Sequence, residues 1–164
     1  MPPFELAQLN VARLVAPLDS PVLADFVANL ERINTLAERS PGFVWRLQTE
    51  VGDATGIRHF GDDILVNLSV WRDVAALRDF VYRTAHVEIM RRRTEWFERM
   101  DAACMVLWWV ASGRRPTLEE ADVRLHRLRE AGPTAEAFLF RRPFAPPGDP
   151  RPAIEALSSE CPVD

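Results

Sequence analysis

The feature that most constrains the fold is the uninterrupted apolar run from Ala103 to Ala111, ACMVLWWVA. It is too short to cross a membrane, because a membrane-spanning helix takes about 18 or more consecutive apolar residues. A short run of this kind is typical of a strand that is buried on both faces. The run therefore predicts a β-strand in the centre of a sheet, so the rest of the chain must supply neighbouring strands and covering layers.

Three other strands are predicted where apolar and polar residues alternate. They cover Phe4–Leu14, Phe43–Val51 and Ile64–Trp71. In the last of these, one face is wholly apolar, whereas Asn67 and Ser69 place polar groups on the other. The residues between 52 and 63, which include several glycines and charged side chains, predict a hairpin loop.

Helices are predicted where apolar residues recur at helical spacing behind a capping residue. The first begins at Ser20-Pro21 and ends at about Arg39. The second begins after Asp73, and residues 85–100 form a further helical segment. Thr117 and the glutamate three residues later form a capping box for a helix that ends at about residue 131.

The order of these elements predicts an α+β fold, a ferredoxin-like split sheet with helices on one face and an extra C-terminal helix. We expect residues 1–144 to form a single domain, followed by a flexible proline-rich tail over residues 145–164. The second face of the sheet carries apolar residues and would be left bare by such an arrangement. A bare apolar face is usually covered by another subunit, so the sequence predicts a homodimer.

Composition excludes several classes of protein. The net charge of −4 and the isoelectric point near 5.5 argue against nucleic-acid binding, and the basic run Arg91–Arg93 is surrounded by glutamates. None of His59, His86 and His126 has a second histidine or a cysteine at metal-ligand spacing, so no metal site is predicted. With neither a membrane span nor a signal pattern, we expect a cytoplasmic location.

The helical segment from Ala85 to Met100 contains two residues that a purely structural helix would not need. When successive residues are placed 100° apart, His86 and Arg93 fall two turns apart, on the same line within the apolar stripe. Burying a guanidinium without a partner costs several kcal/mol, roughly, so Arg93 needs a carboxylate, a carbonyl, water or a ligand. The two residues therefore predict a polar pocket between this helix and the sheet.

The residues expected around this pocket have either polar groups or large apolar side chains, which together typify a small-molecule site. His86, Arg93 and Asn67 are the candidate catalytic residues. The candidate substrate-binding residues are Tyr82, Trp71, Trp96, Ser69, Met90 and Asn10, with Gln8 on the same face of the first strand as Asn10. The structural alternative is that His86 is a core residue and that Arg93 extends past the aromatic residues or pairs across a dimer interface.

The stretch NLSVWRDVAALRDFVYRTAHVEIMRRRTEWFERM, followed by LWWV and RPTLEEADVRLHRLREAGPTAEAFLF, resembles the domain of unknown function 3291 family over about residues 4–144. The family is similar to the dimeric α/β-barrel superfamily. That superfamily includes antibiotic-biosynthesis monooxygenases, haem-degrading monooxygenases and some polyketide cyclases. The resemblance implies a split sheet and a dimer, but it does not imply a particular activity.

In the haem-degrading branch, the site consists of an Asn on the first strand, a Trp near the end of the third and a His on the following helix. The resemblance therefore implies Asn10, Trp71 and His86 as the matching positions, although the spacing from Trp71 to His86 is longer than in that branch. Some relatives also have a His after the last strand where this chain has Arg114.

Three functions remain open from the sequence. The first is a monooxygenase-like or cyclase-like enzyme without metal or built-in cofactor, which acts on a small apolar metabolite, with or without an anionic group, and uses His86 as its base. The second is a haem-binding or haem-degrading protein in which His86 is the axial ligand. The third is a non-catalytic dimeric module that binds a ligand. No nucleotide-binding glycine loop, nucleophile elbow or paired-carboxylate motif is present in the sequence.

Overall fold

The computed structural model describes residues 2–50 and 52–150, and it contains a four-stranded antiparallel sheet. β1 (Phe4–Arg13) lies between β3 (Ile64–Trp71) and β4 (Met105–Ala111), and β2 (Phe43–Arg46) pairs with the far side of β3. The strand order is therefore β2-β3-β1-β4. This is the order of a ferredoxin-like split sheet, so the predicted fold class is confirmed.

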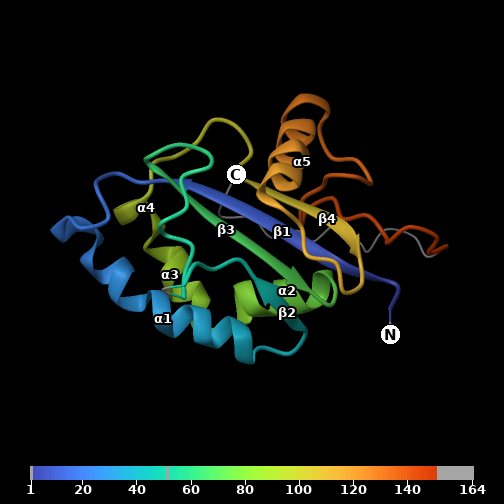
Figure 1. The fold of residues 1–164 in the computed structure, drawn as a ribbon, viewed down its shortest axis with the longest axis horizontal. Coiled ribbons are helices and arrows are strands. Elements are labelled where there is room, and N and C mark those ends of the chain that lie inside the picture. Colours follow the sequence, from blue (N-terminus) through green and yellow to red (C-terminus); the bar gives the residue numbers. More distant parts are fainter. Residues whose placement is uncertain (1, 51, 151–164) are drawn as a thin grey trace.

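The helices follow the strands in the predicted order. They are α1 (Ala24–Arg39), preceded by the short 3-10 helix η1 (Pro21–Leu23), then α2 (Val74–Arg83), α3 (His86–Arg91), α4 (Arg93–Trp96) and α5 (Leu118–Ala131). Figure 1 shows α5 beside β4, whereas α1 to α4 gather along the opposite side of the sheet.

Two of the three predicted side-chain caps are formed. The cap predicted at Ser20 is not formed, because its hydroxyl accepts no hydrogen bond from the short 3-10 helix η1 that follows it. The carboxylate of Asp73 accepts a hydrogen bond of 2.8 Å from the backbone N–H of Ala76, and the hydroxyl of Thr117 accepts one of 3.1 Å from Glu120. Each cap satisfies a backbone donor that the first helical turn leaves unpaired. These contacts fix where α2 and α5 begin.

The apolar run predicted as a central strand lies instead at the edge of the sheet, as β4. Its residues from Cys104 to Trp108 are nevertheless buried, and the segment around Phe138 covers the free edge. The backbone N–H and carbonyl groups of Leu107 and Phe138 exchange two hydrogen bonds of 2.8 Å. An edge strand that is covered in this way can be as apolar as a central strand, so the sequence could not show that β4 lies at the edge, and the predicted central position was wrong.

The predicted strand over Phe43–Val51 is shorter in the structure, because β2 ends at Arg46. One more backbone bond joins Leu47 to β3, and the chain then turns. The backbone N–H and the hydroxyl of Thr49 both donate to the carbonyl of Asp53, at 2.8 and 3.0 Å. Alternation continues in the sequence beyond Arg46, but this local turn takes the chain out of the sheet.

The helical segment predicted over residues 85–100 is broken. α3 ends at Arg91, the φ and ψ angles of Arg92 are −94° and 3°, and α4 ends at Trp96. The guanidinium of Arg92 forms ion pairs with Asp25 at 2.8 Å and Glu95 at 2.9 Å, and it lies 4.8 Å from the Trp96 ring. Arg92 thus joins the break to α1 through Asp25 and to α4 through Glu95 and Trp96.

The second face of the sheet is covered within this chain. Its side chains are at most 6% exposed and comprise Ala7, Leu9, Val11, Val66, Leu68, Val70, Val106 and Trp108. The buried residues of α5 belong to the same core, and the Trp108 indole N–H donates to Glu120 on α5 at 3.1 Å. His59 of the β2–β3 loop pairs with Asp122 of α5 at 3.2 Å. The prediction of a bare face is therefore wrong, because α5 and this loop cover it.

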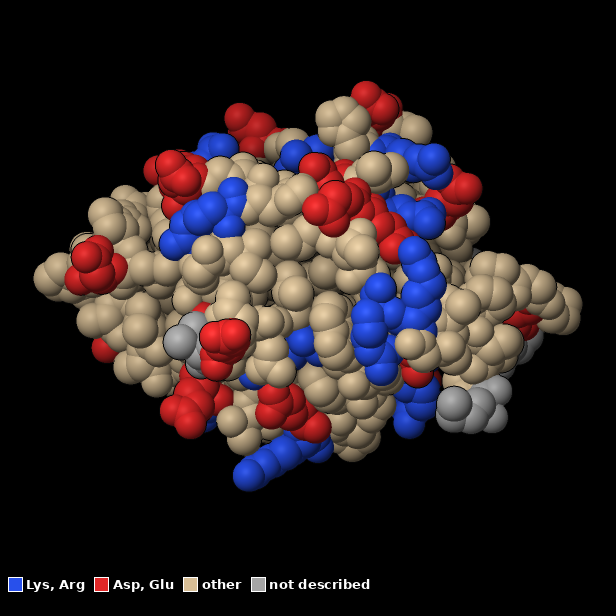
Figure 2. Space-filling model, in the orientation of Figure 1, with Lys and Arg blue, Asp and Glu red and all other residues tan. Residues whose placement is uncertain are grey.

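In the part of the chain that the structure describes, no helix is long and apolar enough to cross a membrane. Figure 2 shows acidic and basic side chains interspersed over the visible face, with basic groups lying beside acidic ones. Of the proline-rich tail, residues 151–164 lie outside the described residues. The tail's flexibility therefore stays a prediction.

Candidate functional site

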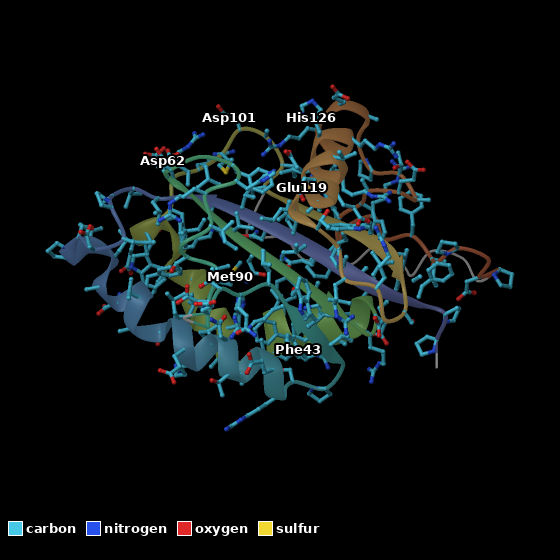
Figure 3. The ribbon with its side chains drawn as sticks, in the orientation of Figure 1. Phe43, Asp62, Met90, Asp101, Glu119 and His126 are labelled. Atoms are coloured by element: carbon cyan, nitrogen blue, oxygen red, sulfur yellow. The ribbon has the colours of Figure 1, made fainter. Side chains whose placement is uncertain are left out.

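A cavity of about 590 Å³ lies between the sheet and the helices α1 to α4. The first face of the sheet forms its floor, and α1 on one side and α2 to α4 on the other form its walls. Figure 3 shows Met90 on α3 and Phe43 on β2, both of which line the cavity, whereas Glu119 and His126 lie on α5. The helices and the sheet thus enclose a space of the size that small-molecule sites usually have.

The floor carries two pairs of polar side chains. Asn10 of β1 lies directly opposite Asn67 of β3, and Gln8 lies directly opposite Ser69. All four line the cavity. Residues two apart on a strand share a face, so the two pairs form a short polar ladder in the middle of an otherwise apolar sheet.

A buried chain of hydrogen bonds fixes one end of this ladder. The indole N–H of Trp71 donates to the Ser69 hydroxyl at 2.9 Å, and that hydroxyl donates to Oε1 of Gln8 at 2.8 Å. An indole can only donate, so the Ser69 proton is left for Gln8, which must present its carbonyl oxygen. The Gln8 amide is thereby oriented, and its NH₂ group remains for another acceptor.

His86 is the first residue of α3 and borders the cavity. Burial lowers the pKa of its imidazole from the ordinary value of 6.5, and the opposing effect of the Val81 carbonyl is smaller. Nδ1 of His86 lies 3.4 Å from that carbonyl. A carbonyl accepts only, so Nδ1 carries the proton and Nε2 presents a lone pair. His86 is therefore a neutral imidazole with an available basic nitrogen at pH 7.

Aromatic rings hold His86 in place. Its ring centroid lies 4.9 Å from that of Phe80, which stacks on Trp71 at 5.1 Å with an angle of 25° between the rings. Trp71 in turn meets the edge of Phe43 at 5.4 Å. Trp71 is only 1% exposed, so it borders the cavity with a small part of its surface and is otherwise packed in the core. This stack connects the position of His86 to the same indole that orients Gln8.

Arg93 begins α4 and also borders the cavity. Its side chain is half-buried, and it forms no ion pair or side-chain hydrogen bond within residues 2–50 and 52–150. Arg46, another cationic residue of the lining, pairs with Glu38 at 2.9 Å. Arg93 thus differs from Arg46 in having its charge available to a ligand.

The structure brings most of the predicted site residues to one cavity. Those that line it are His86, Arg93, Asn67, Tyr82, Trp71, Ser69, Met90 and Asn10. Trp96 does not line it: this side chain is 1% exposed and packs with Leu14, Leu23 and Leu65 beyond one end of the cavity. The prediction for Trp96 assumed one continuous helix, and the break at Arg92 changes the direction in which its ring points.

Sequence reasoning gave Gln8 only a place in the wall, because hydrogen-bond order cannot be read from alternation. It also missed the lining contributed by α1, which includes Asn29, Asn34 and several apolar side chains. The signal for α1 was present in the sequence, since both asparagines lie at helical spacing beside the predicted apolar positions.

The set of residues implied by the resemblance to haem-degrading proteins does not converge here. Asn10 and His86 are accessible from the cavity, but Trp71 is covered and its indole N–H is used by Ser69. The residues present therefore do not fit a haem held by that set. Among the described residues, no group of three or more His, Cys, Asp or Glu side chains could hold a metal ion.

The family model for the domain of unknown function 3291 matches residues 5–154. The chain belongs to this family. A comparison with curated proteins finds no match to the sequence.

Solved structures give distant matches. SnoaB, a cofactor-independent oxygenase from Streptomyces nogalater, is 18% identical with a TM-score of 0.43, over 70% of this chain and 96% of that one. A protein of unknown function from Nitrosomonas europaea is 15% identical with a TM-score of 0.44, over 70% and 95%. A protein from Pseudomonas aeruginosa is 13% identical with a TM-score of 0.44, over 67% and 95%. These likenesses are too distant to assign a function.

Proposed function

We propose that the protein is an enzyme that removes a proton from a small, largely apolar carbon acid, with His86 as the base and without a metal or built-in cofactor. The observation that carries this proposal is that His86, with its free Nε2, and Arg93, with no partner in the described chain, border the same cavity. If His86 were only a core residue and Arg93 only a structural one, there would be no reason for both to border a cavity large enough for a ligand.

The base step follows from the state of His86. A neutral imidazole takes a proton at Nε2, and the electron pair of the broken C–H bond passes to a carbonyl oxygen of the substrate, giving an enolate. Because burial lowers the pKa of His86, the imidazole is already unprotonated at pH 7 and no proton has to leave it first. The apolar side chains of the walls would replace part of the water around the reacting carbon.

The developing oxyanion needs hydrogen-bond donors that are already in place. Asn67 extends from the floor of the cavity, and the oriented NH₂ group of Gln8 lies on the neighbouring strand. Both are neutral donors, so they can stabilise the enolate oxygen without placing a charged side chain beside the neutral ketone before it reacts. Asn10 adds a third amide beside them.

Two reactions can follow from such an anion. With O₂, a methylene group becomes a carbonyl and one water is released, so that four electrons pass from the substrate to one O₂. Without O₂, the enolate carbon attacks a carbonyl in the same molecule and closes a ring, as in a cyclase. The monooxygenase-like and cyclase-like reactions therefore share the proton-removal step, and this step is the one to test.

The test measures exchange of C–H hydrogen for deuterium by NMR, in D₂O without oxygen, over a panel of 1,3-dicarbonyl compounds and aryl ketones that carry a carboxylate. We expect wild-type protein to accelerate exchange in some members and His86→Gln to slow that exchange about 100-fold or more. His126→Gln is the matched control, because His126 is exposed on α5. Admitting O₂ to the active pairs then separates oxygenation, with one O₂ consumed per product, from cyclisation.

If exchange in His86→Gln stays within a few-fold of wild type, His86 is not the base. If compounds of the panel bind but none exchanges, the protein is a ligand-binding module and the enzymatic proposal is wrong. The homodimer and the cytoplasmic location stay predictions from the sequence. The cavity itself is lined by residues of one chain.

A further inference from the structure

Arg93 stands out among the half-buried arginines of the molecule. Arg46 and Arg92 are both neutralised, the first by Glu38 at 2.9 Å and the second by Asp25 and Glu95 at 2.8 and 2.9 Å. Arg93 has no such partner in the described parts of the chain and faces a cavity with apolar walls. A guanidinium so placed is a binding group for an anion.

Arg93 and His86 lie toward different ends of this cavity. His86 packs against Phe80 and hence close to Trp71, which is opposite Leu6 near the start of β1. The backbone carbonyl of Arg93 accepts a hydrogen bond of 2.8 Å from the N–H of Phe97. Phe97 forms an antiparallel β-bridge with Leu14, which lies just past the end of β1.

The lining close to Arg93 also includes Arg99 and Glu98, and Glu98 forms no ion pair with either arginine in the described structure. Because Glu38 neutralises Arg46, the remaining charges of the lining are Arg93 and Arg99 against Asp53 and Glu98. The lining therefore has no net charge, whereas the whole chain has a net charge of −4. Binding of an anion here depends on Arg93 itself, whose guanidinium no acid in the described structure neutralises.

The walls of the space between the two ends are largely apolar, whereas the floor carries the polar side chains of Gln8, Asn10 and Asn67. The apolar side chains of the walls include Phe26, Leu30, Ile33, Ile89, Met90 and Phe97. A ligand that reaches from His86 to Arg93 must therefore be elongated and largely hydrophobic, with one charged end.

We propose that the cavity binds an elongated, largely hydrophobic monoanion whose carboxylate or similar oxyanion is held by Arg93, at the end opposite His86. Arg93 is then a specificity residue that sets where the molecule lies, and it does not touch the carbon that reacts. The inference deepens the proposed function and rests on it only for the statement that the bound molecule is a substrate. The binding mode itself needs no chemistry at His86.

The experiment compares two fluorescent probes of the same shape, 8-anilinonaphthalene-1-sulfonate, which is anionic, and N-phenyl-1-naphthylamine, which is neutral. Affinities are measured for wild type, Arg93→Met, Arg93→Lys and the control Arg91→Met. Arg91 is exposed on α3 and does not line the cavity. We expect Arg93→Met to weaken the anionic probe about 10- to 100-fold and to leave the neutral probe within two-fold, because one charge-assisted contact is lost. Arg93→Lys should recover part of the loss, and Arg91→Met should change neither probe.

Three results would overturn the inference. One is an unchanged affinity of Arg93→Met for the anionic probe. Another is an equal loss for both probes, which would mean that Arg93 maintains the shape of the cavity. The third is a wild-type protein that binds neither probe. Loss of anion selectivity in Arg93→Met together with normal deuterium exchange in His86→Gln would support this inference while refuting the proposed base, so the two proposals fail separately.

Discussion

The two faces of the sheet have the same strands and opposite characters. On the second face, the side chains of β1, β3 and β4 are nearly all apolar and fully covered by α5 and the β2–β3 loop. On the first face, polar residues alternate with apolar ones, and about 590 Å³ between the sheet and the helices is left unfilled. Close packing stabilises a fold, and space with oriented polar groups allows binding. We infer that the second face supplies most of the stability and that the first face supplies the function.

The sharpest test of this contrast removes a side chain from each face. Leu125 of α5 is 1% exposed in the covered core, whereas Leu30 of α1 is half-buried beside the cavity. We expect Leu125→Ala to lower the free energy of unfolding by about 2–5 kcal/mol, because it creates a new cavity. Leu30→Ala enlarges an existing space and should lower it by about 1 kcal/mol or less. Urea unfolding measures both, and equal losses would contradict the contrast.

Ser69 is where the first face contributes to stability as well as to function. Ser69→Ala leaves the Trp71 indole N–H and the Gln8 carbonyl without their partner in a buried site. We expect a loss of about 1–3 kcal/mol in unfolding free energy. The control Ser112→Ala removes an exposed hydroxyl and should change stability by about 0.5 kcal/mol or less.

The same Ser69→Ala variant has a functional readout. If the hydrogen-bond chain orients Gln8, deuterium exchange should slow by more than the loss of folded protein explains. Exchange at the wild-type rate per folded molecule would show that the chain is structural only.

The smallest expected effect is a pH dependence that belongs to His86. Burial holds its pKa in the folded state below the ordinary 6.5, so both states are neutral above that value and the group then has no effect. As the pH falls below 6.5, the unfolded chain takes up the proton first, and the folded state loses stability. We expect wild type to lose more stability than His86→Gln between pH 7 and 5 in urea unfolding, with His126→Gln parallel to wild type. Parallel curves for wild type and His86→Gln would contradict this.

The sequence predicted well what depends on neighbouring residues. β3 covers the predicted Ile64–Trp71 to the residue, and the caps at Asp73 and Thr117 form as expected. Alternation and capping are local signals, so tertiary contacts did not need to be known.

The predictions that failed depended on contacts between distant segments. At the break, Arg92 pairs with Asp25, 67 residues earlier, and beyond the break Trp96 packs outside the site. The edge position of β4 was concealed because Phe138 covers it. The polar pocket was predicted because a buried guanidinium requires a partner, and this requirement does not depend on where the helix ends. His86 and Arg93 accordingly border one cavity although the helix between them is broken.

One further consequence follows from α1. Of the α1 residues only Ala37 is buried, at 9% exposure. The side of α1 that faces the sheet lies over the cavity, so the helix has few packing contacts along most of its length. We expect its amide hydrogens to exchange through local opening well before those of β1 and β3. A bound molecule would supply the missing contacts between α1 and the sheet, so the ligand would complete the hydrophobic core and stabilise the folded protein. Slowing of amide exchange on binding should then be greatest in α1.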